Sequence, residues 1–174
     1  MLAIRIVGMI ITLAASSALG MYLASRAVFR KHDLLEIRKA LSILKSEIEF
    51  AASPLPEAMA NIAARTTGPI SDIAGHFAAR LKNNDGETAY DLWLYSIESH
   101  KKSSFLTEED TEVLGGFGKT LGYLDKQMQA DSIKFTMDYI DTQVTEIQEG
   151  SQKNQRMYKS LGVIGGILLL VVFW

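Results

Sequence analysis

The chain has 174 residues, a formal net charge of −2 and no cysteine. The missing cysteines exclude disulfides and thiolate metal sites, and the small net charge provides no basic field that would attract nucleic acid. Between two apolar ends, the chain is long enough for one domain.

The first predicted element is an N-terminal transmembrane anchor over residues 1–26. No charged side chain occurs from Ile6 to Ser25, which matches the roughly 20 apolar residues that a spanning helix needs. A cleaved secretory signal is the alternative, because Arg5 precedes a short apolar run that contains small residues. The basic residues that follow favour the uncleaved anchor, since they would stop transfer through the membrane; they are Arg26, Arg30 and Lys31.

The middle of the chain, residues 27–159, is predicted to be an all-α bundle. Its apolar residues recur at helical spacing, and no alternating strand pattern reaches a convincing length. We expect a first long helix that continues inward from the anchor and carries a heptad seam. The seam residues are Leu34, Ile37, Leu41, Leu44, Ile48 and Ala51. Ser53-Pro54 then ends this helix and begins the next, because serine caps helices and proline suits the first helical position.

Four shorter helices are predicted next, each bounded by turn or cap signals. They lie at residues 54–65, 70–82, 87–100 and from 108 onward. Thr67-Gly68-Pro69 and Asn83-Asn84-Asp85-Gly86 are the turn signals between them. Thr107 is expected to cap the last of the four, whose first turn has three carboxylates that complement the helix dipole.

The last helix of the domain is predicted to be the longest and to continue into a short C-terminal transmembrane segment, residues 160–174. Its seam residues are Ile133, Met137, Ile140, Val144, Ile147, Ser151, Asn154, Tyr158 and Leu161. The uncharged tail from Leu161 to Trp174 would be only about 21 Å long as a helix, so a slightly short span is expected, with a buried core helix as the alternative. Gly162 and Gly166 have the spacing of a membrane helix-packing pair, which also arises by chance in glycine-rich spans.

Basic residues lie at the inner edge of both apolar ends. Lys153, Arg156 and Lys159 precede the second segment, as the basic cluster noted above follows the first. Since lysine and arginine near a span stay on the cytoplasmic side, the pattern predicts a cytoplasmic domain with both termini across the membrane.

The motifs that resemble catalytic or binding sites lack the surroundings that such sites need. Gly118-Lys119-Thr120 resembles part of a phosphate-binding loop, but Val113 stands where that loop requires glycine, and the preceding residues are helical. Close helix packing explains these glycines better. His32, His76 and His100 are far apart in the sequence, with no pair at helical ligand spacing. We therefore expect no enzyme, no cofactor and no metal site.

Three groups of residues carry a family pattern. They are Ala40-Leu41 with Ser46–Phe50 and Ser53-Pro54-Leu55, then Phe117–Gly122 with Asp125 and Gln129, and finally Lys153-Asn154 with Lys159–Gly162. With these residues the chain resembles the stage III sporulation protein AB family of endospore-forming bacteria. The resemblance extends over nearly the whole chain, although the first anchor matches only in character.

This resemblance implies a non-enzymatic platform or adaptor subunit of the secretion-like channel complex between mother cell and forespore. The family is similar in fold to the cytoplasmic domains of inner-membrane platform proteins from type II secretion and type IV pilus machines. It thereby implies a place in the mother-cell membrane around the forespore, with the helical domain in the mother-cell cytoplasm contacting an ATPase. The alternative is a self-associating membrane scaffold with no direct ATPase contact.

A partner surface is expected on the face of the domain away from the two long helices. The basis is the exposed charge around the connection that precedes residue 108. The candidate residues are Lys101, Lys102, Glu108, Glu109 and Glu112.

Overall fold

The computed structural model describes residues 25–51, 53–83, 86–122 and 126–173, and for residues 151–173 it describes only the helical backbone. Every regular element in these ranges is a helix, which confirms the all-α fold class. In chain order the elements are the N-terminal helix (residues 25–46), the π-helical turn η1 (Glu47–Ala51), α2 (Leu55–Arg65), α3 (Pro69–Asn83), α4 (Ala89–His100), the 3₁₀ turn η2 (Lys101–Ser103), α5 (Glu108–Phe117), the 3₁₀ turn η3 (Gly118–Thr120) and α6 (Lys126–Phe173).

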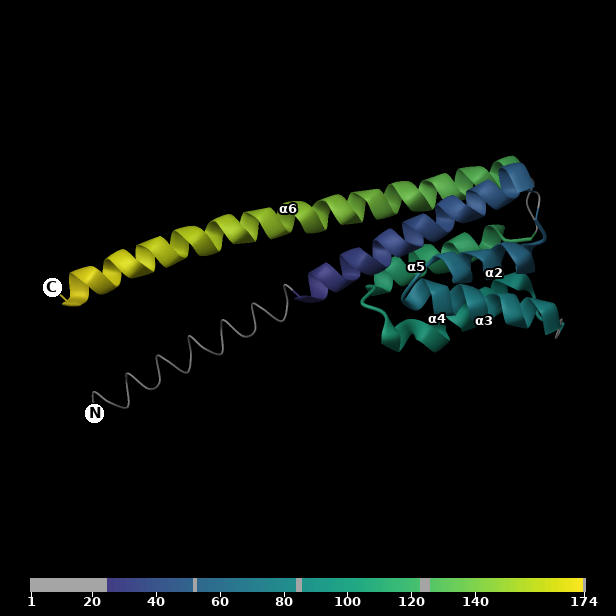
Figure 1. Ribbon diagram of the computed structural model, residues 1–174, viewed down its shortest axis with the longest axis horizontal. Coiled ribbons are helices and arrows are strands. Elements are labelled where there is room, and N and C mark those ends of the chain that lie inside the picture. The colour runs from purple at the N-terminus through teal and green to yellow at the C-terminus, as the bar shows by residue number, and fades with distance from the viewer. Residues whose placement is uncertain (1–24, 52, 84–85, 123–125, 174) are drawn as a thin grey trace.

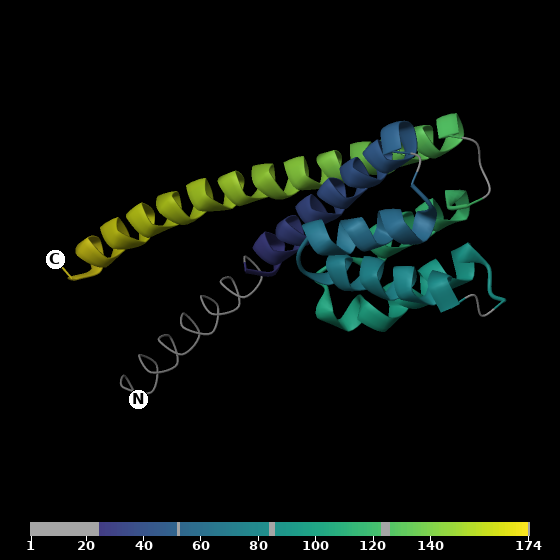
Figure 2. The same ribbon diagram turned by 45° about the vertical axis from the view of Figure 1, so that its right-hand side comes forward.

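The helices run alternately up and down the molecule. The N-terminal helix and α6 are the two longest; they lie side by side and antiparallel, and α2 to α5 form a bundle on one side of the pair (Figure 1). The N-terminal helix begins and α6 ends at the same end of the molecule, which we call the proximal end (Figure 2). At the opposite, distal end lie η1 and the start of α6. The second half of α6 extends beyond the bundle at the proximal end.

The predicted seams hold the two long helices to the rest of the fold. In the N-terminal helix the seam residues Leu34, Ile37, Leu41 and Leu44 are each less than 5% exposed. Three seam residues of α6 are likewise buried, namely Ile133, Ile140 and Val144. Burying one such side chain stabilises a fold by about 1.5–3 kcal/mol, so the seams form the main hydrophobic contact of these helices. The N-terminal seam ends earlier than expected, since Ala51 is exposed.

The shorter helices occur where the sequence predicts them, with one difference at a cap. Thr107 caps α5 as expected, and its hydroxyl accepts a hydrogen bond from the Asp110 backbone. Ser53 does not cap α2, because its hydroxyl instead donates to the Glu47 carboxylate at 2.6 Å. Pro54 occupies the N-cap position and makes no side-chain cap bond. The carboxylate of the preceding turn is therefore the stronger acceptor for this serine.

Aromatic rings and a close glycine contact form the centre of the bundle. Trp93 packs edge-on against Phe77 and Phe117, with ring centroids 5.3 and 6.1 Å apart. A β-carbon on Gly118 would lie 2.1 Å from Trp93 Cδ1, so only glycine fits against the indole. This contact confirms that Gly118-Lys119-Thr120 is a packing motif, and Lys119 places its ammonium 6.0 Å above the Tyr90 ring.

The membrane predictions concern residues that the structure describes only in part. Among the described residues, no helix has the length and apolar character needed to cross a membrane. The predicted anchor at residues 1–26 lies almost entirely outside them. Residues 160–173 continue α6, but their side chains are not described, so the Gly162–Gly166 contact stays a prediction.

Candidate interaction surface

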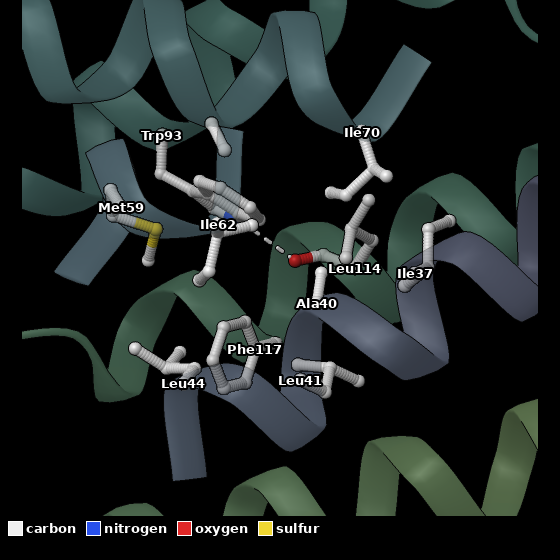
Figure 3. Close-up of a pocket in the computed structure, with 11 residues that line it drawn as sticks. Ile37, Ala40, Leu41, Leu44, Met59, Ile62, Ile70, Trp93, Leu114 and Phe117 are labelled. Carbon is white, nitrogen blue, oxygen red and sulfur yellow. Dashed lines mark hydrogen bonds between the residues drawn. The ribbon is translucent and has the colours of Figure 1, made fainter. Parts of the chain in front are cut away.

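Two small cavities in the interior of the described bundle leave too little room for a substrate or cofactor. A cavity of about 10 Å³ lies between the N-terminal helix, α2 and α4, and holds at most about one water molecule. Apolar side chains surround it, and the indole N–H of Trp93 is already bonded to the Leu114 carbonyl at 2.8 Å (Figure 3). Its position among core residues identifies it as a packing gap. In the parts of the chain that the structure describes, no three acidic or histidine side chains come close enough to hold a metal ion.

Two of the three histidines meet in space, although they are 24 residues apart in the sequence. The rings of His76 and His100 lie 5.5 Å apart because α3 and α4 are antiparallel neighbours. Both bond to the buried Ser96, His76 to its hydroxyl at 3.0 Å and His100 to its carbonyl at 2.9 Å. Burial lowers the pKa of His76, as do the positive charges of His100 and Arg80. The pair therefore joins α3 to α4, a contact that the separation of these histidines in the sequence does not predict.

A buried ion pair connects the N-terminal helix, α5 and α6. Arg30 donates two hydrogen bonds to the Asp110 carboxylate, from Nε at 2.7 Å and from Nη2 at 2.8 Å. The same Nη2 bonds to Gln143 of α6 at 2.7 Å, and Tyr139 of α6 donates to Asp110 at 2.9 Å. The Thr107 amide adds a further bond to the carboxylate at 2.8 Å. All three elements are thus held by one carboxylate, whose side chain is only 1% exposed.

The protonation states follow from these contacts. Burial alone would raise the pKa of Asp110, but the bonds from Arg30, Thr107 and Tyr139 together hold it below its usual range. Burial and the adjacent carboxylate raise the pKa of Tyr139, so its hydroxyl keeps the proton that it donates. The acidic start of α5, interpreted from the sequence as a charged helix end, therefore contains one residue with a tertiary role. Arg30 lies 80 positions away, and no local pattern connects the two residues.

The connection between α4 and α5 packs against the start of the N-terminal helix. Asp33 is 6% exposed and accepts a hydrogen bond from the Phe105 amide at 2.8 Å. The rings of Phe29 and Phe105 stack with centroids 4.8 Å apart. The surface predicted from charge thus adjoins a long helix at the proximal end of the bundle, and its expected location away from the long helices is wrong. The physical reason is this pairing of residues about 70 positions apart in the chain, which charge alone does not predict.

Four of the five candidate residues are exposed, and the half-buried Lys101 makes a contact with one of them. Lys101 Nζ lies 3.1 Å from the Glu108 carboxylate, which leaves Glu108 itself 81% exposed. Lys102, Glu109 and Glu112 are also exposed. An exposed pair of this kind contributes little to stability, so these residues are available to a partner. Their role in binding stays a prediction.

Two further exposed faces, on the long helices, were missed at the sequence level. The outer face of the N-terminal helix consists of Val28, Lys31, Leu35, Lys39 and Ser42. The outer face of α6 consists of Phe135, Asp138, Thr142, Glu146 and Glu149. Residues seven positions apart share a helix face, so Val28–Leu35–Ser42 and Phe135–Thr142–Glu149 were detectable signals.

The family model described as stage III sporulation protein AB matches residues 5–174 of this chain. The chain belongs to the stage III sporulation protein AB family. This result confirms the resemblance carried by the sequence motifs. It also places the chain among sporulation proteins.

One characterised relative and one solved structure agree with this assignment. The stage III sporulation protein AB of Bacillus subtilis (strain 168) is 27% identical over 169 residues, which cover 97% of this chain and 98% of that protein. A solved structure of stage III sporulation protein AB (SpoIIIAB) has a TM-score of 0.66 and 26% sequence identity. It covers 72% of this chain and is itself matched over 98% of its length.

Proposed function

We propose that this family member is a non-enzymatic platform or adaptor subunit of the channel complex between mother cell and forespore. It is anchored in the mother-cell membrane at both ends, and its helical bundle engages a cytoplasmic ATPase. The observation that carries the proposal is the antiparallel pair of long helices. The N-terminal helix begins, and α6 extends, toward the same proximal end of the molecule (Figure 1), and each adjoins an apolar segment in the sequence.

Double anchoring explains the distribution of charge along the chain. Both apolar ends are uncharged over their central parts, and basic residues follow the first and precede the second. Such residues stay on the cytoplasmic side and are attracted to anionic lipid. With the two segments in one membrane, the bundle and the distal end would face the mother-cell cytoplasm.

A role in binding rather than catalysis agrees with the use of the polar side chains. The buried Asp110 holds three elements together, and the two neighbouring histidines join α3 to α4. The cavity in the core has apolar walls and too little room for a substrate. The polar residues that remain exposed in groups are those suited to contacts with other proteins.

The contact with the ATPase is proposed at the exposed group around Lys102, Glu109 and Glu112. Its proximal position would bring the ATPase beside the bundle and close to the membrane. Charges of both signs at the rim of an interface steer association and contribute to specificity.

Replacing Glu112 by lysine tests this contact, because its exposed side chain can reverse its charge without disturbing the fold. Glu112→Lys should lower co-purification of the ATPase from sporulating cells by about tenfold, since like charges across an interface cost several kcal/mol. Glu57→Lys, a reversal of an exposed carboxylate at the start of α2, is the control and should leave capture unchanged. Equal capture by both variants would remove this surface from the proposal.

A self-associating scaffold is the second candidate function. The observation in its favour is the opposite charge of the two outer faces, basic on the N-terminal helix and acidic on α6. Under this alternative the family member would organise copies of itself and make no direct contact with an ATPase.

A further inference from the structure

The outer face of the N-terminal helix is exposed, apolar along its centre and basic at its sides. Val28 is 64% exposed and Leu35 is 42% exposed, although both are large aliphatic side chains. Lys31 and Lys39 flank them, and the side chain of Lys39 is 50% exposed. Lys39 lies 3.7 Å from the Glu36 carboxylate one turn earlier, whose side chain is 17% exposed. Because Lys39 itself is half-exposed, it can exchange this loose pair for another carboxylate.

The outer face of α6 has the same pattern with the opposite charge. Phe135 is 71% exposed, and among the large hydrophobic side chains that the structure describes only Phe50 is more exposed. Asp138 lies one turn from Phe135, and Glu146 and Glu149 follow further along the same face. An exposed phenyl ring followed by carboxylates along one helix face suits a partner with an apolar centre and basic residues beside it.

The antiparallel register places matching groups at the same height along the molecule. Arg38 pairs with Asp141, and Arg30 bonds to Gln143, which defines the levels of the two helices relative to each other. From these contacts, Lys39 lies at about the level of Asp138, and Lys31 at about that of Glu146.

The apolar centres match in the same way. Phe135 lies at about the level of Ser42, whose small side chain leaves room for an aromatic ring. The two outer faces point away from each other's helix, since the buried seams lie between the long helices and the bundle. One copy therefore cannot bring its own two faces together.

We propose that the outer face of α6 in one copy binds the outer face of the N-terminal helix in the next copy. Rotation about an axis parallel to the long helices keeps every residue at its own height. It would set Lys39 against Asp138 and Phe135 against Ser42 without a shift along the axis. Because the two patches differ, the contact is head-to-tail and generates a ring or an array, as heterologous interfaces do. The proposal rests on the double anchoring proposed above, since copies in one membrane are related by such a rotation.

The absence of cysteine permits a direct test in cells that express the full-length chain. One chain carries only Lys39→Cys, and a second, differently tagged chain carries only Asp138→Cys. Oxidation of cells that contain both should produce a disulfide-linked pair with one copy of each tag. Either chain alone should yield at least about tenfold less cross-linked product, because a head-to-tail contact does not bring identical positions together.

Two controls test the register and the electrostatic contribution. Lys39→Cys combined with Glu149→Cys uses the same two faces, but position 149 lies roughly 16 Å further along α6 and should not cross-link. In chains with only Phe135→Cys and Ser42→Cys as reporters, Lys39→Glu or Asp138→Lys should each reduce the yield by about tenfold, and the two together should restore it. Circular dichroism on the charge variants verifies that the helices remain.

Three results would overturn the inference, and none depends on the ATPase. They are no product from the mixed chains, equal product from Asp138→Cys chains alone, and equal product at position 149. Equal product from Asp138→Cys chains alone would indicate a symmetric dimer. No product from the mixed chains is the result expected if the α6 face binds only a basic peptide from another protein. Fractionation of the same cells separates the two proposals. Chains absent from the membrane would contradict the double anchoring. Membrane-bound chains without cross-links would contradict only the head-to-tail contact.

Discussion

At the residue scale, the tightest requirement in the described part of the fold is the contact between Gly118 and Trp93. The indole ring lies against the glycine backbone, and its N–H bonds to the Leu114 carbonyl. The sequence Gly118-Lys119-Thr120 resembles part of a phosphate-binding loop but lies at the end of a helix, without the loop that such a site needs. The contact with Trp93 explains why glycine occurs there. The glycine is needed at this position because it lacks a side chain.

Gly118→Ala should destabilise the protein by about 1–3 kcal/mol, because the new methyl group would overlap the indole of Trp93. Gly116→Ala is the matched control, since a β-carbon there meets nothing within 4 Å. That change should be neutral or stabilise the fold by about 0.5 kcal/mol. Urea unfolding followed by circular dichroism measures both variants. A cost as small for Gly118 as for Gly116 would show that the indole can move aside.

At the scale of elements, apolar periodicity predicted the helices well because each one buries a regular stripe. The seam Leu34–Ile37–Leu41–Leu44 is buried as expected, and Thr107 caps α5. Helix caps were less predictable. Ser53 has the residue type of a cap, but a carboxylate six positions earlier competes for its hydroxyl. A local pattern does not reveal such a competitor, since its position depends on the π-helical turn of η1.

The polar contacts between elements were not predictable for a related reason. Arg30 and Asp110 are 80 residues apart, and each has a satisfactory local interpretation, one as a basic residue beside an anchor and the other as part of an acidic helix start. Only the packing of α5 against the N-terminal helix assigns them to each other. The same holds for Arg38 and Asp141, which join the two long helices near the surface.

The two arginine–aspartate pairs should differ strongly in their contribution to stability. Asp110→Asn should cost about 3 kcal/mol, because it leaves the partly buried guanidinium of Arg30 without its counter-charge. Asp141→Asn should cost less than about 1 kcal/mol, since its pair is 42% and 48% exposed. Chemical denaturation at pH 7 measures the difference. Equal costs would mean that burial does not determine the strength of these pairs.

The buried pair also predicts how stability depends on pH. The pKa of Asp110 is lowered in the folded state, so its charged form stabilises the fold above the unfolded value of about 3.9. This contribution is lost as the pH falls through the folded pKa. Asp110→Asn should therefore lose less stability than the unmodified chain between pH 5 and the acid limit. Asp33, whose pKa burial raises, acts in the opposite direction in both proteins and cancels in the difference.

At the scale of the whole molecule, the order of the helices determines which end of the bundle each connection reaches. The α4–α5 connection comes to the proximal end because the chain reverses at every turn before it (Figure 1). From their charge we expected Lys101, Lys102 and Glu112 to be exposed, and none of them is buried. Their position beside the N-terminal helix depends instead on the contacts of Phe105 with Phe29 and Asp33. The proposed partner surface would therefore lie near the membrane rather than far from it.

The same arrangement makes the proposed topology testable. A reporter placed after His100 should report the cytoplasm, because that position lies in the bundle between the long helices in chain order. A reporter at the C-terminus should report the opposite side of the membrane if residues 160–174 cross it. Replacing the basic residues Lys153, Arg156 and Lys159 together should weaken this orientation, since lysine and arginine flanking a span determine which side remains cytoplasmic. If both reporters lie on one side, the short tail does not span, and the antiparallel pair would be held by the first anchor alone.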